Sequence, residues 1–278
     1  MSMAKNKILA VLANYGSEQL DYLEMVVREL KSFKKYEVNI VVHSNIPLDH
    51  ITGIDKVTLF EKTTGIRTFN DFLVRKKWGK KWSGMLFNWQ MLPMTCRRVI
   101  DAEADKYDVF LFNENDHLFK EYHIDNFIRY ESILPENRIA GLIRYEEDES
   151  GRYYPDYHGD YDWDFSSVER YGNLIFAHLT NVHQGSFLIS KRQLMKIKEN
   201  YDFSNFLSSD HYRLMPKTNT DIYQHAGMKK LICISEFEQN LIHHLPNLYV
   251  HGDKGRAKLN SDENRMQNAL KRLLNYKK

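Results

Sequence analysis

One segment constrains the fold more than any other, an apolar run that ends in acidic residues. Residues 107–112 are mostly apolar or aromatic, and Glu114 and Asp116 follow directly. A short apolar run bounded by polar residues is typical of a buried strand in a parallel sheet. In open α/β sheets, ligands bind beside the loops that follow such strands. The segment therefore predicts an α/β fold with an acidic site at one edge of its sheet.

The two carboxylates of this segment are two residues apart. If the strand stays extended for one more step, Glu114 and Asp116 point to the same side. Two such groups offer a hard oxygen site for Mg²⁺ or Mn²⁺ carrying a phosphorylated ligand. The alternative is a solvated acidic turn without a ligand, and the residues alone leave both interpretations open.

The start of the chain predicts a βαβ unit. Residues 8–13 form an apolar run that ends in Asn14-Tyr15-Gly16-Ser17, residues 18–33 carry apolar side chains at helical spacing, and residues 38–42 predict the next strand. A right-handed crossover then places the turn at Tyr15 and the loop at Glu114 on the same edge of the sheet. Because neither G-x-G-x-x-G nor a P-loop is present, a nucleotide bound here is held by other means, such as stacking on Tyr15.

The rest of the chain continues this alternation of strands and helices. We expect a central, mostly parallel sheet flanked by helices, with a small antiparallel insertion, in a single domain spanning residues 1–278. Its parts are a nucleotide-binding half (7–145), an acceptor-side half (146–255) and a C-terminal helix (256–278). The further predicted strands are 57–60, 138–143, 174–178, 185–189 and 231–234, and the further predicted helices are 93–104, 124–133, 191–199, 220–227 and 262–274.

Two segments of unusual composition each allow two interpretations. Residues 146–172 are rich in aromatic and acidic side chains without a visible period, so we expect an insertion that either holds a sugar or packs as an ordinary aromatic hairpin. Residues 75–82 are rich in Lys, Arg and Trp, which suits a solvated loop or a contact with a pyrophosphate. We expect residues 174–178 and 185–189 to pair with each other.

Composition excludes several classes of protein. Lys and Arg total 39 against 37 Asp and Glu, so the net charge of +2 gives no basic field for nucleic acid. Two cysteines are too few for a disulfide framework, which favours a reducing compartment. The first apolar run is too short for a signal or a transmembrane segment. We therefore expect a cytoplasmic protein without a transmembrane segment.

Four ordered motifs resemble one known group of enzymes. They are Asn14-Tyr15-Gly16-Ser17, the segment from Phe110 to Asp116, His183-Gln184-Gly185-Ser186-Phe187-Leu188-Ile189, and His243-His244-Leu245-Pro246-Asn247-Leu248-Tyr249. In this order they resemble GT-A-fold glycosyltransferases, specifically a family of small bacterial and viral-type sugar transferases. The resemblance implies transfer of a sugar from a nucleotide-diphosphate sugar donor to a glycan or other hydroxyl acceptor.

The resemblance also implies which residues form the site. The acidic triplet is the counterpart of a D-x-D metal motif, although Asn115 replaces an Asp and removes one formal charge. A C-terminal histidine near the metal is expected as well, so the expected ligands of Mn²⁺ or Mg²⁺ are Asp116, Glu114, His243 and His244. If that His pair is extended, only one of the two rings reaches the site. The residues expected to bind the nucleotide-sugar are Ala13, Asn14, Tyr15, Gly16, Asn45, Glu114, Asn115, Gln184 and Gly185.

An inverting transfer needs a carboxylate base near the acceptor hydroxyl. Asp221 is the first candidate and Asp210 the second, although Asp221 also suits the cap of a helix. Two other functions compete with transfer. One is a carbohydrate- or nucleotide-binding module without turnover, favoured by Asn115 and by the aromatic segment at residues 146–172. The other is a metal-dependent phosphohydrolase, which is less well supported because the sequence lacks the repeated His/Asp pairs of a two-metal centre.

Overall fold

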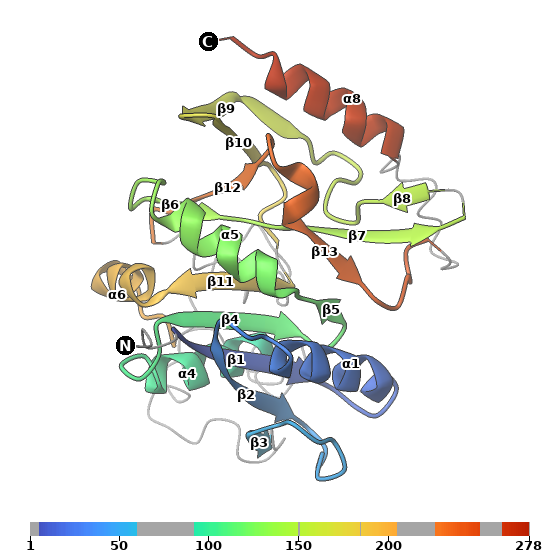
Figure 1. Cartoon of the computed structure of the whole chain (residues 1–278), viewed down its shortest axis with the longest axis vertical. Coiled ribbons are helices and arrows are strands. Elements are labelled where there is room, and N and C mark those ends of the chain that lie inside the picture. The colour runs from blue at the N-terminus through green and yellow to red at the C-terminus, as the bar shows by residue number, and fades with distance from the viewer. Residues whose placement is uncertain are drawn as a thin grey trace, which may run out of the picture.

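The computed structural model describes residues 6–59, 92–149, 151–183, 185–204, 226–250 and 263–277. Its largest sheet has five strands in the order β11-β4-β1-β2-β3 (Figure 1). Strands β1, β2, β3 and β4 are parallel to their neighbours, and β11 runs antiparallel to β4 at the edge. The bounds are β1 Lys7–Asn14, β2 Glu37–Ser44, β3 Lys56–Leu59, β4 Val109–Glu114 and β11 Ser186–Ser190.

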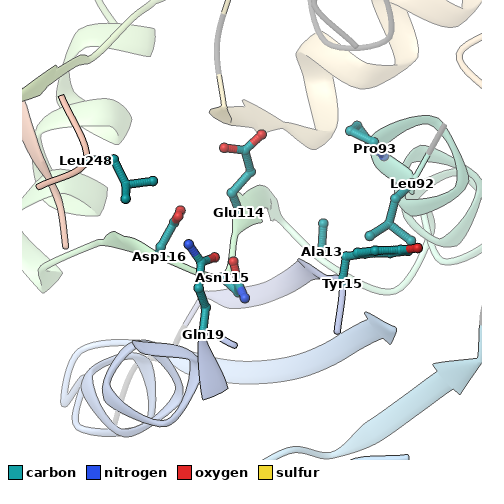
Figure 2. Close-up of a pocket in the computed structure, with 9 residues that line it drawn as sticks. All are labelled: Ala13, Tyr15, Gln19, Leu92, Pro93, Glu114, Asn115, Asp116 and Leu248. Carbon is teal, nitrogen blue, oxygen red and sulfur yellow. The ribbon is translucent and has the colours of Figure 1, made fainter. Parts of the chain in front are cut away.

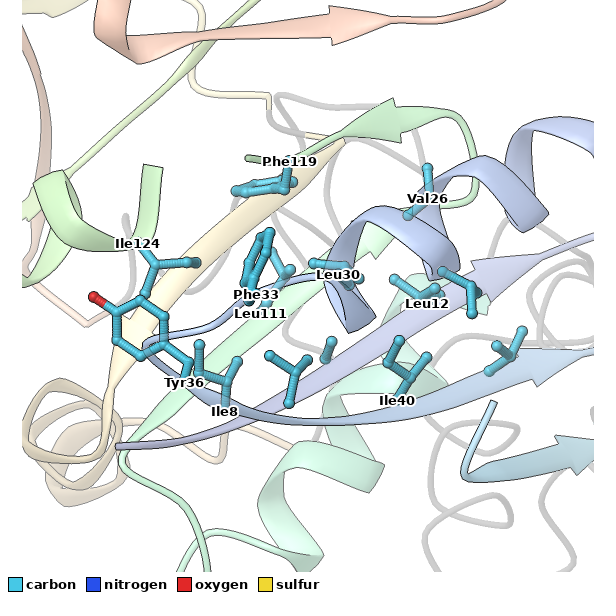
Figure 3. Packing of buried hydrophobic residues seen from close by; sticks show 14 of the residues in the cluster. Ile8, Leu12, Val26, Leu30, Phe33, Tyr36, Ile40, Leu111, Phe119 and Ile124 are labelled. Carbon is cyan, nitrogen blue, oxygen red and sulfur yellow. The ribbon is translucent and has the colours of Figure 1, made fainter. Parts of the chain in front are cut away.

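Both faces of this sheet are covered by helices because its strands are apolar on both sides. Ile8, Ala10 and Leu12 face α1 (Leu20–Lys31) and α5 (Glu121–Glu131), as Figure 3 shows for part of this core. Leu9 and Val11 face α4 (Leu92–Ala102) and α6 (Lys191–Asn200) on the other side. The alternation along β1 thus sends successive side chains into two separate cores.

Two four-stranded sheets complete the described structure, in the orders β6-β12-β10-β9 and β5-β13-β7-β8. In the second of these, β13 pairs with β5 so that His244 lies opposite His117. The helix α8 (Glu263–Leu274) packs with Trp163, Ala177 and Ile232 in a third core. The remaining bounds are β5 His117–Leu118, β6 Arg138–Ala140, β7 Ile143–Asp148, β8 Gly151–Tyr153, β9 Trp163–Tyr171, β10 Leu174–Leu179, β12 Lys229–Cys233, the 3-10 helix η3 Phe237–Asn240 and β13 Leu241–His244.

The predicted α/β class with a parallel central sheet is confirmed. The opening βαβ unit, the helix that starts near Pro93 and the C-terminal helix all lie where the apolar periodicity placed them. The predicted strand over residues 138–143 is divided, because β6 ends at Ala140 and β7 begins at Ile143 in a different sheet.

Two predictions about the second half of the chain are wrong. Residues 146–172 are not an insertion outside the core, because β7, β8 and β9 run through them; of the two alternatives, the packed hairpin holds, since β7 and β8 pair antiparallel. Tyr154, Tyr157 and Trp163 are 0%, 3% and 4% exposed, so these rings fill a core and offer no face to a sugar. Strands β10 and β11 do not pair with each other either, since β10 pairs with β9 and β12 while β11 joins the edge of the main sheet at β4.

Several predicted features lie outside the described residues. They include the basic stretch at 75–82 and nearly all of the helix predicted over residues 220–227. Within the described part of the chain, none of the helices combines the length and the apolar character that a membrane crossing requires.

Candidate functional site

The turn after β1 and the loop after β4 meet at the carboxyl edge of the main sheet. Ala13 lies opposite Glu114 in the parallel register of the two strands. The side chain of Asn115 donates from Nδ2 to Oδ1 of Asn14 over 2.8 Å, and Asn14 donates to Oγ of Ser44 at the end of β2. Three neighbouring strand ends are therefore tied together by buried amide and hydroxyl groups.

A cavity of about 300 Å³ opens at this edge. One part of its lining is apolar and includes Tyr15, which is 50% exposed, with Leu92 and Pro93 beside it. The other part carries the acidic loop, and Figure 2 shows Glu114 between Leu92 and Pro93 on one side and Leu248 on the other. The full lining is Ala13, Tyr15, Gln19, Leu92, Pro93, Glu114, Asn115, Asp116 and Leu248. An aromatic face near carboxylates suits a ligand that has both a ring and a charged end.

Three buried side chains next to this cavity have the geometry of a metal site. Asp116, His117 and His244 each offer one ligand atom, and the three atoms lie within 4.8 Å of one another. Oδ1 of Asp116 and Nε2 of His117 are 3.6 Å apart and buried, and neither has a hydrogen-bond partner among the residues that the structure describes. Nε2 of His244 is 3.4 Å from Oδ2 of the same carboxylate. Buried polar atoms without partners are uncommon, and here they converge on one point.

A chain of hydrogen bonds sets the tautomer of His117. Asn113 donates from Nδ2 to the His117 carbonyl oxygen over 2.8 Å, which turns its Oδ1 toward Ser186. The Ser186 hydroxyl donates to that Oδ1 over 2.5 Å, so its oxygen accepts from Nδ1–H of His117, also over 2.5 Å. Nε2 of His117 therefore keeps a free lone pair toward Asp116. Burial lowers the pKa of His117 to about 3, which keeps the ring neutral.

A carboxylate orients the ring of His244 so that its Nε2 faces Asp116, as Nε2 of His117 does. Its Nδ1 is 2.5 Å from Oε1 of Glu146, which is fully buried. Burial alone would lower the pKa of His244, but its bonds to Asp116 and Glu146 outweigh burial and raise the pKa to about 9. Without an ion the ring is thus an imidazolium between two carboxylates. A cation bound at Nε2 would replace that proton.

The two carboxylates of the acidic loop differ in their environment. Burial opposes the charge of Asp116, but the bond from His244 and the charge of nearby Arg144 outweigh it, so its pKa is lowered. Burial and the charge of Asp116 raise the pKa of Glu114 to about 7. Glu114 Oε2 is 3.6 Å from Nε2 of His117, and the side chain faces the cavity with 24% of its surface exposed. Asp116 belongs to the cluster of three, whereas Glu114 lies beside it.

Gly185, which directly precedes the edge strand β11, packs against the site. Its carbonyl oxygen accepts from the Glu114 amide over 3.1 Å. A Cβ at this position would collide with Cε1 of His117 and would lie 2.7 Å from Oε2 of Glu114. Only glycine leaves room for both side chains.

The remaining residues that the sequence suggested have varied positions. Gly16 has a positive φ of 76°, and its amide donates to Oδ1 of Asn45 over 2.7 Å, so Asn45 shapes the turn rather than the cavity wall. His243 lies on the opposite face of β13 from His244 and stacks on Tyr145 with ring centroids 4.9 Å apart, which removes it from the cluster. Gln184, Asp210 and Asp221 lie outside the described residues.

Sequence reasoning missed His117 as a candidate ligand and Glu146, Ser186 and Arg144 as its surroundings. His117 follows Asp116 directly in the sequence, and this adjacency to the acidic loop was the only signal that could have suggested a metal-binding role. Its role depends on β5, a strand of two residues whose pairing with β13 no local pattern reveals.

No family model matches the chain, and no curated protein matches it. Among solved structures, the chain is similar to the crystal structure of S. aureus TarS 1–349, with a TM-score of 0.44 and 12% sequence identity. The aligned region covers 91% of this chain and 68% of that one.

Proposed function

We propose that this protein is a metal-dependent glycosyltransferase that moves a sugar from a nucleotide-diphosphate sugar to a hydroxyl acceptor, with a GT-A-like fold. The observation that supports it most is the cluster of Asp116, His117 and His244, whose unpartnered buried atoms lie beside a cavity with an aromatic wall. The ordered motifs of the sequence support the same activity.

The ligand set fits a transition-metal ion better than Mg²⁺. Two imidazole nitrogens and one carboxylate oxygen suit Mn²⁺ and its neighbours, whereas Mg²⁺ prefers oxygen ligands. We assign Asp116, His117 and His244 as the ligands, with Mn²⁺ as the ion. Bound there, a divalent cation would neutralise the two donor phosphates and the charge of the leaving nucleoside diphosphate.

The other side chains of the cavity then have separate roles. Tyr15 provides the face on which the nucleoside base stacks. Glu114 is directed into the cavity beside the cluster, so we assign it to the hydroxyl groups of the donor rather than to the ion. Asn115 holds Asn14 and the turn after β1 in place. The acceptor is a carbohydrate or another hydroxyl compound, and Asp221 or Asp210 stays the proposed base.

Binding of nucleoside diphosphates tests the proposal. We expect at least one of UDP, GDP, CDP and ADP to bind in the presence of Mn²⁺, as measured by calorimetry, and EDTA to abolish that binding. Asp116→Ala should abolish it as well, and a far-UV circular dichroism spectrum like that of the wild type should show that the loss is not unfolding. This check is needed because Oδ2 of Asp116 also lies 3.4 Å from Nε2 of His244. His243→Ala is the matched control, since its ring lies on the other face of the same strand. Unchanged binding in Asp116→Ala would refute the assigned role.

Turnover separates an enzyme from a binding module. The purified chain should release nucleoside diphosphate from the matching nucleotide-sugar when Mn²⁺ is present. Tight binding without any release, over a panel of sugars and acceptors, would favour the module without turnover.

A further inference from the structure

Glu146 connects two parts of the site that are separate along the chain. It lies on β7 and is 0% exposed. Its Oε1 bonds to Nδ1 of His244, and its Oε2 accepts from the backbone amides of Tyr249 and Val250, over 2.6 and 2.8 Å. A single carboxylate thus receives one imidazole and two backbone groups.

The two amides belong to the segment that carries Leu248. After β13 the chain reverses at Asn247, which has a positive φ of 49° and donates from Nδ2 to the Glu147 carbonyl oxygen over 3.0 Å. The reversal turns the amides that follow toward Glu146 and leaves Leu248, 51% exposed, on the wall of the cavity. Figure 2 shows Leu248 beside Asp116 at this wall.

We infer that Glu146 is a positioning residue that orients the ligand His244 and fixes the Leu248 segment against the cavity at the same time. Both oxygens are needed as acceptors, because the three groups that face them are all donors. Metal binding and the shape of the cavity wall therefore depend on one side chain. The metal part of this inference rests on the proposed function, whereas the orientation of the ring and the segment does not.

The isosteric change Glu146→Gln tests the inference. Glutamine has one carbonyl oxygen and one amide group, so it serves either His244 or the two backbone amides and presents a donor to the other side. Without metal, we expect amide exchange at Tyr249 or Val250 to accelerate at least tenfold, or the slowly exchanging Nδ1–H signal of His244 to disappear. With Mn²⁺, we expect the affinity to fall by about 10- to 100-fold, as is usual when the partner of a ligating histidine is lost.

Two matched variants separate the effects. Glu147→Gln removes the neighbouring charge, which is 49% exposed and 3.5 Å from Arg152, and should change none of the three readouts. Asp116→Asn should lose Mn²⁺ affinity but keep the amide protection at Tyr249 and Val250. If Glu146→Gln does not fold, Glu146→Asp replaces it in the test. Aspartate keeps the charge but is one methylene shorter, so it should lose its bond to His244 or its bonds to the amides of Tyr249 and Val250.

The outcomes are distinct. Wild-type amide protection, Nδ1–H signal and Mn²⁺ affinity in the variant at Glu146 would overturn the inference. A loss confined to Mn²⁺ affinity, with the ring and the segment unchanged, would overturn it too. If the wild-type protein binds no Mn²⁺, the proposed function fails, and the two readouts without metal still decide whether Glu146 orients His244 and holds the segment.

Discussion

Two buried clusters of polar side chains lie close enough for the charge of Arg144 in one to act on Asp116 in the other, and they differ in whether all their polar atoms have partners. Arg144 and Asp156 form an ion pair in which Nε and Nη2 of Arg144 donate to Oδ1, and the Arg144 amide donates to Oδ2. No buried polar atom of this pair lacks a partner among the described residues. In the cluster of Asp116, His117 and His244, two buried atoms, Oδ1 of Asp116 and Nε2 of His117, have no partner in the described part of the chain.

This difference in hydrogen bonding distinguishes a cluster that stabilises the fold from one that can bind a cation. A buried ion pair whose atoms are all bonded holds the fold, and removing one partner leaves an uncompensated charge. A buried carboxylate and an imidazole that face each other without a proton between them have free lone pairs for a cation. Substitutions in the Arg144–Asp156 pair should therefore lower the free energy of unfolding, whereas substitutions in the cluster of Asp116, His117 and His244 should weaken cation binding.

Asp156→Ala is expected to have the largest effect. It leaves the Arg144 guanidinium buried without its partner, so the free energy of unfolding should fall by about 3–5 kcal/mol. Urea denaturation measures this. Glu37→Ala, which breaks an ion pair with Lys7 whose side chains are both 52% exposed, is the control and should cost at most about 1 kcal/mol. If both variants lost the same free energy of unfolding, the Arg144–Asp156 pair would contribute no more to stability than an exposed ion pair.

The pH dependence of stability tests the other region. The pKa of His244 in the folded protein, about 9, lies above its ordinary value of 6.5, so its contribution is complete below pH 6.5 and is lost as the pH rises to 9. The contribution is at most about 3 kcal/mol. The difference in unfolding free energy between the metal-free wild type and His244→Gln should shrink over this window. If the difference in unfolding free energy stays constant from pH 6.5 to 9, His244 is not protonated in the metal-free folded protein.

Ser186→Ala should have the smallest effect. It removes the acceptor that holds His117 in the Nδ1–H tautomer, so Mn²⁺ affinity should fall by about 10- to 100-fold. Nitrogen chemical shifts of the ring should show the other tautomer gaining population. Ser167→Ala, a change at another buried serine, should leave Mn²⁺ affinity as it is. A single unchanged tautomer in Ser186→Ala would show that the hydroxyl does not set it.

The fold was predictable where the signal is local. The apolar run at residues 8–13 and the helical spacing at 18–33 depend on neighbours along the chain, and both predict the observed elements. The partners of β10 and β11 depend on strands far away in the sequence, so the expected hairpin was wrong. Tyr154 and Tyr157 lie in the segment between β8 and β9, so they follow no strand or helix period, and their core partners on α8 lie about a hundred residues later in the chain.

The same distinction applies to the site. The prediction that loops at Tyr15 and Glu114 share one edge follows from the handedness of crossovers, and the register of β1 and β4 places them together. The expectation that only one residue of the His pair reaches the site follows from strand alternation, and His244 is the one beside Asp116. The contribution of His117 arises from a two-residue pairing and from the bond to Ser186, both of which only the folded chain supplies.

Gly185 has a consequence of its own. Since a Cβ there would collide with the His117 ring and lie 2.7 Å from Glu114, even the smallest possible side chain would force the groups around the cluster to shift. Gly185→Ala is therefore a route to a protein that keeps its sheets but no longer holds the proposed ion. Such a chain would serve as an inert scaffold of the same shape, obtained by adding a single methyl group.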